Sequence, residues 1–186
     1  TREEAENAVK VLIEWAGDDP KREGLIETPK RVVKAFEEYF SGYSKNPKNI
    51  LEKTFFETGN YQEFVLLNNI QFRSHCEHHL APIIGYAAVA YIPDGKVVGI
   101  SKLARIVDVF AKRLQTQETM TSQIANSIQN NLNPKGVAVF LSAEHHCMSS
   151  RGVSKAHVDM TTTFFTGSFK ENHNLQNRFL NSLANK

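Results

Sequence analysis

The hydrophobic residues of this 186-residue chain change their spacing about a third of the way along. Before residue 60 they recur every three or four positions, which predicts helices over 8–16 and 28–42. After it, the elements follow in the order strand, strand, helix, helix, strand, strand and helix, over residues 64–72, 83–92, 103–114, 120–132, 137–141, 158–166 and 175–183. This order is typical of an α+β fold and not of a strictly alternating, doubly wound sheet.

The chain divides into two predicted parts. Residues 1–60 form a helical N-terminal arm and a linker, and residues 61–186 form the main domain. In the arm, Thr28 is the expected N-cap of the second helix because Pro29 follows it at the first helical position. The linker is expected at 41–60, where proline, glycine and scattered polar residues replace the apolar pattern.

Charge and composition exclude several classes of protein. With 41% hydrophobic and 23% charged residues, the chain is too apolar for intrinsic disorder. A net charge of +2 without a run of like charges argues against a nucleic-acid partner. No apolar stretch approaches the roughly 18 residues that a membrane span needs. The polar start lacks a signal-peptide core and only two cysteines occur, so we expect a cytoplasmic protein.

Histidine and cysteine gather in two short windows. Five of the seven histidines and both cysteines lie in 75–79 and 145–147, each at or just after the end of a predicted strand. Loops at strand ends can aim side chains from a rigid sheet at one point. The two windows therefore predict a single site.

Thiolate and imidazole together favour zinc, with Cys76, His79 and Cys147 as ligands. Three protein ligands leave a coordination position for water, which is typical of a catalytic zinc. His78 and His145 then remain to transfer protons near neutral pH. The alternatives are ordinary ones, since a single cysteine is usually a small core residue and a Cys76–Cys147 disulfide is geometrically possible.

A second cluster suggests an anion site. Ser101 is an expected N-cap, and Lys102 and Arg105 lie three apart in the first turn of the predicted helix, where cations oppose the helix dipole. A bound polyphosphate explains them, and two solvated surface charges explain them equally well. Arg31 and Arg151 are weaker phosphate candidates. The carboxylate of Glu118, after Gln117, either stabilises a helix start or accepts hydrogen bonds from a guanine.

At these residues the chain resembles GTP cyclohydrolase I. The resemblance covers residues 61–186, with Thr28–Val32 recognisable upstream, and rests on the motifs Cys76–His79, Gly99–Val107, Arg113–Glu118 and His145–Met148, leading to Arg151–Gly152. It implies zinc on Cys76, His79 and Cys147, with acid–base roles for His78 and His145. It also implies substrate binding by Gln117 and Glu118 on the guanine side and by Ser101, Lys102, Arg105, Arg151 and Arg31 on the triphosphate side.

The resemblance also implies a fold, an assembly and a reaction. The fold is a T-fold, a four-stranded antiparallel sheet with two long helices on one face, preceded by a helical arm. The assembly is a homo-oligomer, a decamer with active sites between subunits. The reaction is hydrolytic opening of the guanine imidazole ring of GTP, with release of formate and rearrangement to 7,8-dihydroneopterin triphosphate, the first step of pterin and tetrahydrofolate biosynthesis.

Other classes of function remain open from the sequence. A zinc-stabilised nucleic-acid module requires four ligands and a basic face, and the near-neutral charge speaks against it. A binding protein that holds a purine or pterin has no need of His78 and His145. A related T-fold enzyme acting on another purine or pterin is the nearest enzymatic rival.

Overall fold

The computed structural model describes residues 1–56, 59 and 61–184, and they divide into two compact units, Thr1–Ser41 and Gly42–Lys186. In the first unit, α1 (Arg2–Trp15) packs against α2 (Thr28–Tyr39), so the helices predicted here are confirmed. A capping box between Thr1 and Glu4 satisfies free amides at the start of α1. Glu27, not Thr28, is the N-cap of α2, which places Thr28 inside the first turn.

The predicted linker contains regular structure in its described part. It forms η1 (Ser41–Ser44), α3 (Pro47–Leu51) and β1 (Thr54–Phe55), while residues 57, 58 and 60 of the linker lie outside the described residues. Leu51 is fully buried in the core of the second unit, and β1 pairs with β4 (Val97–Val98). The units therefore divide after Ser41, earlier than the boundary predicted at residue 60, because these short elements pack with the sheet domain.

Across the described residues, the main sheet of the second unit has the strand order β5-β2-β3-β6-β7. Its long strands are antiparallel, as predicted: β2 (Val65–Cys76), β3 (Pro82–Ile92), β6 (Gly136–His145) and β7 (Asp159–Phe165). A short fifth strand, β5 (Leu114–Gln115), was not predicted, and it pairs in parallel with the end of β2. Two residues are too few to show a hydrophobic period.

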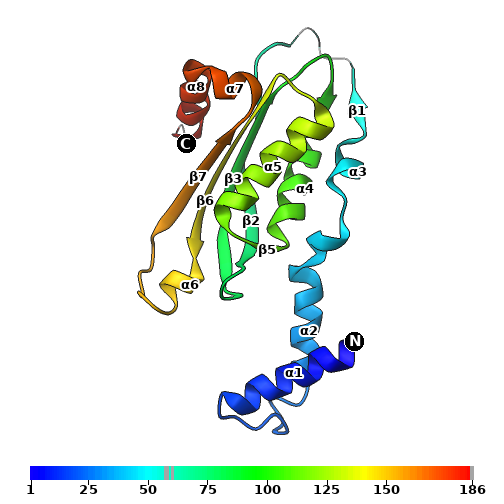
Figure 1. The fold of residues 1–186 in the computed structure, drawn as a ribbon, viewed down its shortest axis with the longest axis vertical. Helices are drawn as coiled ribbons and strands as arrows, with labels where there is room; N and C mark the ends of the chain where they lie inside the picture. The colour runs from blue at the N-terminus through cyan, green and yellow to red at the C-terminus, as the bar shows by residue number, and fades with distance from the viewer. Residues whose placement is uncertain (57–58, 60, 185–186) are drawn as a thin grey trace. The chain divides into compact units, whose positions relative to one another are not determined.

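Helices cover both faces of this sheet, but unequally. The predicted pair, α4 (Ile100–Ala111) and α5 (Gln117–Leu132), lies along one face (Figure 1). On the other face, α7 (Gly167–Glu171) and α8 (His173–Ala184) form a smaller cluster around Phe169 and Phe179. In β3, Ala87 and Val89 belong to the larger core while Ala88 and Ala90 belong to the smaller one, as expected from alternating side chains. The expected arrangement of four long antiparallel strands with two long helices on one face is present, and β5 and the cluster of α7 and α8 are additions to it.

No helix among the residues that the structure describes is both long enough and apolar enough to cross a membrane.

The register of β3 brings two distant parts of the chain to one level. Ile83 pairs with Ser74 of β2 on one side and with His145 of β6 on the other. Cys76 and Cys147 each follow two residues after these partners of Ile83. The two cysteines therefore leave the sheet at the same end, separated by the width of one strand.

The close contact between β3 and β6 makes Gly85 a sensitive position. A Cβ built on Gly85 would lie 2.1 Å from the Ser142 carbonyl oxygen and 2.5 Å from the Ala143 Cβ. We expect Gly85→Ala to lower the free energy of unfolding by about 1–3 kcal/mol, because the backbone of β6 must move. Urea denaturation measures this change. Gly24→Ala, whose nearest atoms belong to the flexible Arg22 side chain, is the control, and equal midpoints for the two variants would contradict the prediction.

Candidate functional site

The turn between β2 and β3 is held by backbone hydrogen bonds. The Cys76 amide donates to the Ala81 carbonyl at 2.8 Å, and the Leu80 amide donates to the Cys76 carbonyl at 2.9 Å. On the side of β5, the Glu77 amide donates to the Gln115 carbonyl at 3.0 Å. Leu80 has a φ of 54°, a left-handed conformation that non-glycine residues adopt at some cost. Neighbouring strands thus determine the shape of the turn.

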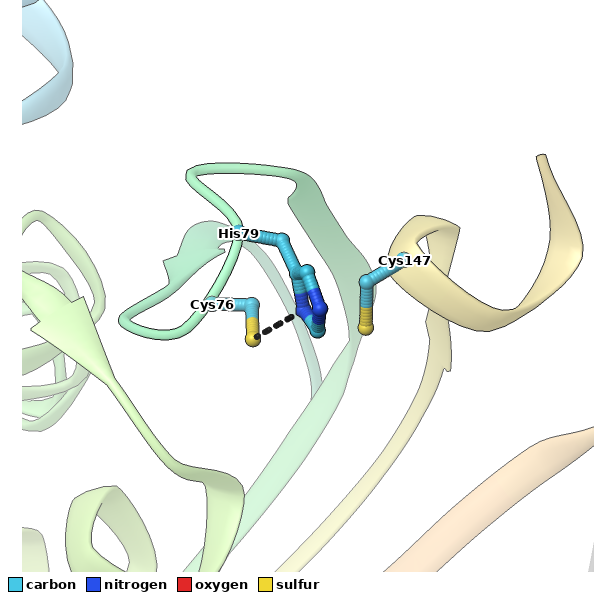
Figure 2. A group of neighbouring side chains, drawn as sticks. All are labelled: Cys76, His79 and Cys147. Atoms are coloured by element: carbon cyan, nitrogen blue, oxygen red, sulfur yellow. Dashed lines mark hydrogen bonds between the residues drawn. The ribbon is translucent and has the colours of Figure 1, made fainter. Parts of the chain in front are cut away.

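Three side chains converge beside this turn. Cys76 at the end of β2, His79 in the turn and Cys147 in α6 (His146–Ser149) place their ligand atoms within 4.8 Å of one another (Figure 2). The distance from Cys76 Sγ to His79 Nδ1 is 3.9 Å. The residues predicted as metal ligands therefore do lie together.

The geometry suits a small tetrahedral ion. Metal–sulfur bonds of about 2.3 Å and metal–nitrogen bonds of about 2.0 Å put ligand atoms roughly 3.5–3.8 Å apart, so small side-chain rotations close the cluster. Among the described residues, no other histidine, cysteine, aspartate or glutamate joins the group. Burial, together with the neighbouring Cys76 thiol, raises the pKa of Cys147, so a cation would have to displace its proton. The group can hold a metal ion with one position open.

His78 lies in the same turn but is exposed. Its Nδ1 is 3.8 Å from Cys76 Sγ, and its Nε2 is 3.7 Å from a carboxylate oxygen of Glu77. Its imidazole is therefore open to solvent beside the cluster. His146, which lies between His145 and Cys147, is not part of the ligand group.

His145 is half-buried at the end of β6. Its Nε2 lies 2.8 Å from Oε1 of Gln117, the first residue of α5. Burial lowers the pKa of His145, and the nearby Glu118 carboxylate opposes this shift. The imidazole is therefore predominantly neutral at pH 7, a form that can accept a proton.

The side chain of Gln117 was expected to bind substrate, but the structure places it inside the protein. It has no exposed surface, and its amide is engaged by the protein itself. This contact with His145 could not be predicted from the sequence, because the two residues are 28 positions apart and a glutamine at a helix start has many uses.

Two other predicted site residues are close enough to His145 and Cys147 to affect their pKa values. Glu118, exposed in the first turn of α5, acts on the pKa of His145. Arg151, exposed just after α6, acts on the pKa of Cys147. A carboxylate and a guanidinium therefore flank the metal ligands of one chain.

The predicted anion-binding residues stand elsewhere in the same chain. Ser101 and Arg105 are exposed and Lys102 is half-buried in the first two turns of α4. Gly99, not Ser101, is the N-cap, because α4 already begins at Ile100. The segment just before α4 is fixed by the Val98 amide, which donates to the Tyr91 hydroxyl at 3.1 Å.

This position is far from the metal ligands. Tyr91 is eight positions along β3 from Ile83, which corresponds to about 26 Å of strand. The other end of α4 leads into β5, which pairs with Cys76 (Figure 1). One chain thus carries its cation cluster and its metal ligands at opposite ends of the sheet. Arg31 is exposed on α2 of the first unit.

Comparisons with known proteins agree with these motifs. A family model described as GTP cyclohydrolase I matches residues 5–184. GTP cyclohydrolase 1 of Hyphomonas neptunium is 59% identical over 181 residues, which are 97% of this chain and 88% of that protein. The enzyme of the same name from Maricaulis maris is 57% identical, over 98% of this chain and 89% of its own. A crystal structure of the archaeosine synthase QueF-Like is 20% identical with a TM-score of 0.48, over 57% of this chain and 95% of that chain.

The ligand cluster predicts how the chain retains metal. Cys147→Ser replaces a strong sulfur ligand with a weak oxygen ligand, so we expect metal affinity to fall at least 10- to 100-fold. Metal content after dialysis, measured by plasma emission spectrometry, tests this. The matched control is His146→Ala, which changes the adjacent residue outside the cluster and should leave the metal content unaltered. Equal metal retention by the two variants would contradict the assignment.

Proposed function

The chain belongs to the GTP cyclohydrolase I family, and we propose that it opens the imidazole ring of guanine in GTP with Cys76, His79 and Cys147 as zinc ligands. The reaction consumes one water, releases C8 of the purine as formate and leaves 7,8-dihydroneopterin triphosphate. Its product serves pterin biosynthesis. The observation that carries the proposal is the convergence of two thiols and one imidazole, without a fourth ligand among the described residues.

Zinc, when bound, supplies Lewis acidity that makes water a usable nucleophile near neutral pH. The residues around it handle protons. His78 is open to solvent, and burial favours the neutral form of His145, so in this proposal the two protonate a ring nitrogen and accept a proton during ring opening. A metal centre with two thiol ligands suits a reducing compartment, and we place the activity in the cytoplasm.

The remaining site residues bind the substrate in this proposal. Glu118 is exposed beside His145 and accepts hydrogen bonds from the guanine edge. Ser101, Lys102 and Arg105 surround the triphosphate at the start of α4, where backbone amides and the helix dipole favour anions. Arg151 adds positive charge near Cys147, and Arg31 on α2 reaches the triphosphate from a neighbouring subunit.

The separation between the cation cluster and the metal ligands favours a site that includes a second copy of the chain. The segment just before α4 is anchored at Tyr91, which is about 26 Å of strand from Ile83, at whose level the metal ligands leave the sheet. We therefore propose that each active site combines the metal end of one subunit with the α4 start of another, in a homo-oligomer of the decameric kind. The edge strand β7 offers unpaired backbone groups for such an assembly.

The central test is formate release. We expect the zinc-loaded protein to release formate from GTP in proportion to the pterin product that forms, measured by a formate dehydrogenase assay and by pterin fluorescence after oxidation. A strong chelator should abolish both signals and added zinc should restore them. A protein that forms no formate from GTP with a full complement of zinc would overturn the proposed function.

The anion helix generates a prediction about substrate affinity. Lys102→Ala should raise KM for GTP about 10- to 100-fold, because one charge-assisted contact to phosphate is lost. Lys112→Ala, at the opposite end of α4, is the matched control and should leave KM unchanged. Steady-state kinetics at fixed ionic strength distinguishes the two. An unchanged KM for Lys102→Ala would remove this residue from the phosphate site.

A mixing experiment tests the shared site. Cys147→Ser chains lack a metal ligand, and chains with both Lys102→Ala and Arg105→Ala lack the cation cluster, so each homo-oligomer should be nearly inactive. Co-expressed chains should recover part of the activity, because some sites then combine two intact halves. If the mixed sample shows no more activity than the sum of its parts, the site belongs to a single chain.

A further inference from the structure

Gln117 has an unusual position for a polar residue at a helix start. Its side chain has no exposed surface, yet it connects three parts of the domain. Its Nε2 lies 2.8 Å from the Met160 carbonyl in β7 and 3.3 Å from the Leu141 carbonyl in β6, and its Oε1 lies 2.8 Å from His145 Nε2. Burying an amide this completely is costly unless its polar atoms are paired, as they are here.

The hydrogen-bond partners of the Gln117 amide determine which of its two ends is the NH2 group and which is the oxygen. Carbonyl oxygens only accept hydrogen bonds, so the atom that faces Met160 and Leu141 must be the NH2 group. The oxygen of Gln117 then faces His145, and this oxygen can only accept. His145 Nε2 must therefore donate. In the neutral imidazole this leaves Nδ1 as the nitrogen with the free lone pair.

Two threonines hold the amide in this orientation. The Thr121 hydroxyl donates to the Gln117 backbone carbonyl at 2.6 Å, which uses its only proton. The Thr162 hydroxyl, 2.7 Å from Thr121 Oγ1, must then be the donor between the two threonines. A lone pair of Thr162 remains to accept from Gln117 Nε2 at 3.2 Å. The two N–H protons of Gln117 are thus shared among three acceptors, the carbonyls of Met160 and Leu141 and the Thr162 hydroxyl.

We propose that Gln117 is a positioning residue that keeps His145 in the Nε2–H tautomer, so that Nδ1 is the ring nitrogen left with an available lone pair. The role of Gln117 in the reaction rests on the proposed function, whereas the tautomer itself does not.

The direct test is the tautomer of His145. We would label the zinc-loaded protein with 15N-histidine, sediment it, and record solid-state NMR spectra at a pH where the ring is neutral, using a His145→Asn sample to assign the signals. The expected result is a protonated Nε2 and an unprotonated Nδ1. A protonated Nδ1 in the wild-type protein would overturn the proposal, whatever the activity of the sample.

The second test uses matched variants on one helix. Gln117→Met keeps the approximate volume but removes the amide, and we expect kcat to fall about 10- to 100-fold with zinc content and KM for GTP nearly unchanged. The control is Gln129→Met in α5, which also loses an amide that bonds a carbonyl (Pro134) and a hydroxyl (Thr166). Both variants should lose similar stability, but only Gln117→Met should show both tautomers of His145.

The outcomes separate the proposal from its premise. If Gln117→Met and Gln129→Met have the same kcat, or if Gln117→Met retains a single Nε2–H tautomer, Gln117 has only a structural role. Should Gln117→Met fail to fold, the wild-type spectrum still decides the tautomer. Absence of formate release from the wild-type protein, together with an Nε2–H tautomer, would refute the proposed reaction and leave the positioning of His145 in place.

Discussion

The pairing of β3 with both β2 and β6 is the constraint on which the candidate site depends. Ile83 has Ser74 on one side and His145 on the other, so the strands that carry the two cysteines end at the same level. Residues 71 positions apart in the chain can then share one ion. A shift of one residue in either pairing would turn the last side chains of β2 or β6 to the opposite face of the sheet. The contact at Gly85 maintains the spacing of β3 and β6 close to this point.

Much of this architecture could be predicted from the sequence because it follows from periodic apolar residues. The long strands and helices of the sheet domain matched their predicted places within a few residues, and the histidine and cysteine windows correctly indicated one ligand cluster. The sequence did not reveal α3 or β5, since elements of two to five residues are stabilised by their neighbours in space and carry no period. Ser101 was misplaced as the N-cap for a related reason, because the helix already begins at Ile100, with Gly99 as its N-cap.

The function of Gln117 illustrates a different limit. A glutamine at the start of a helix is compatible with capping, substrate binding or solvent exposure, and only the three-dimensional positions of Met160, Thr162 and His145 distinguish these uses. The motifs also do not reveal the wide separation of the cation cluster from the metal ligands, because Lys102 and Glu118 lie close in sequence. Both features arise from how the helices are placed over the sheet (Figure 1).

The backbone hydrogen bonds of the turn that carries Cys76 and His79 have a consequence for how the chain binds metal. These bonds are made by backbone atoms alone, and the core below them consists mostly of residues outside the ligand group, although Cys76 belongs to it and Cys147 packs against it. Classical zinc fingers, by contrast, unfold without their metal. Because backbone bonds shape the turn, we expect the chain to bind its metal ion at a site that is already folded.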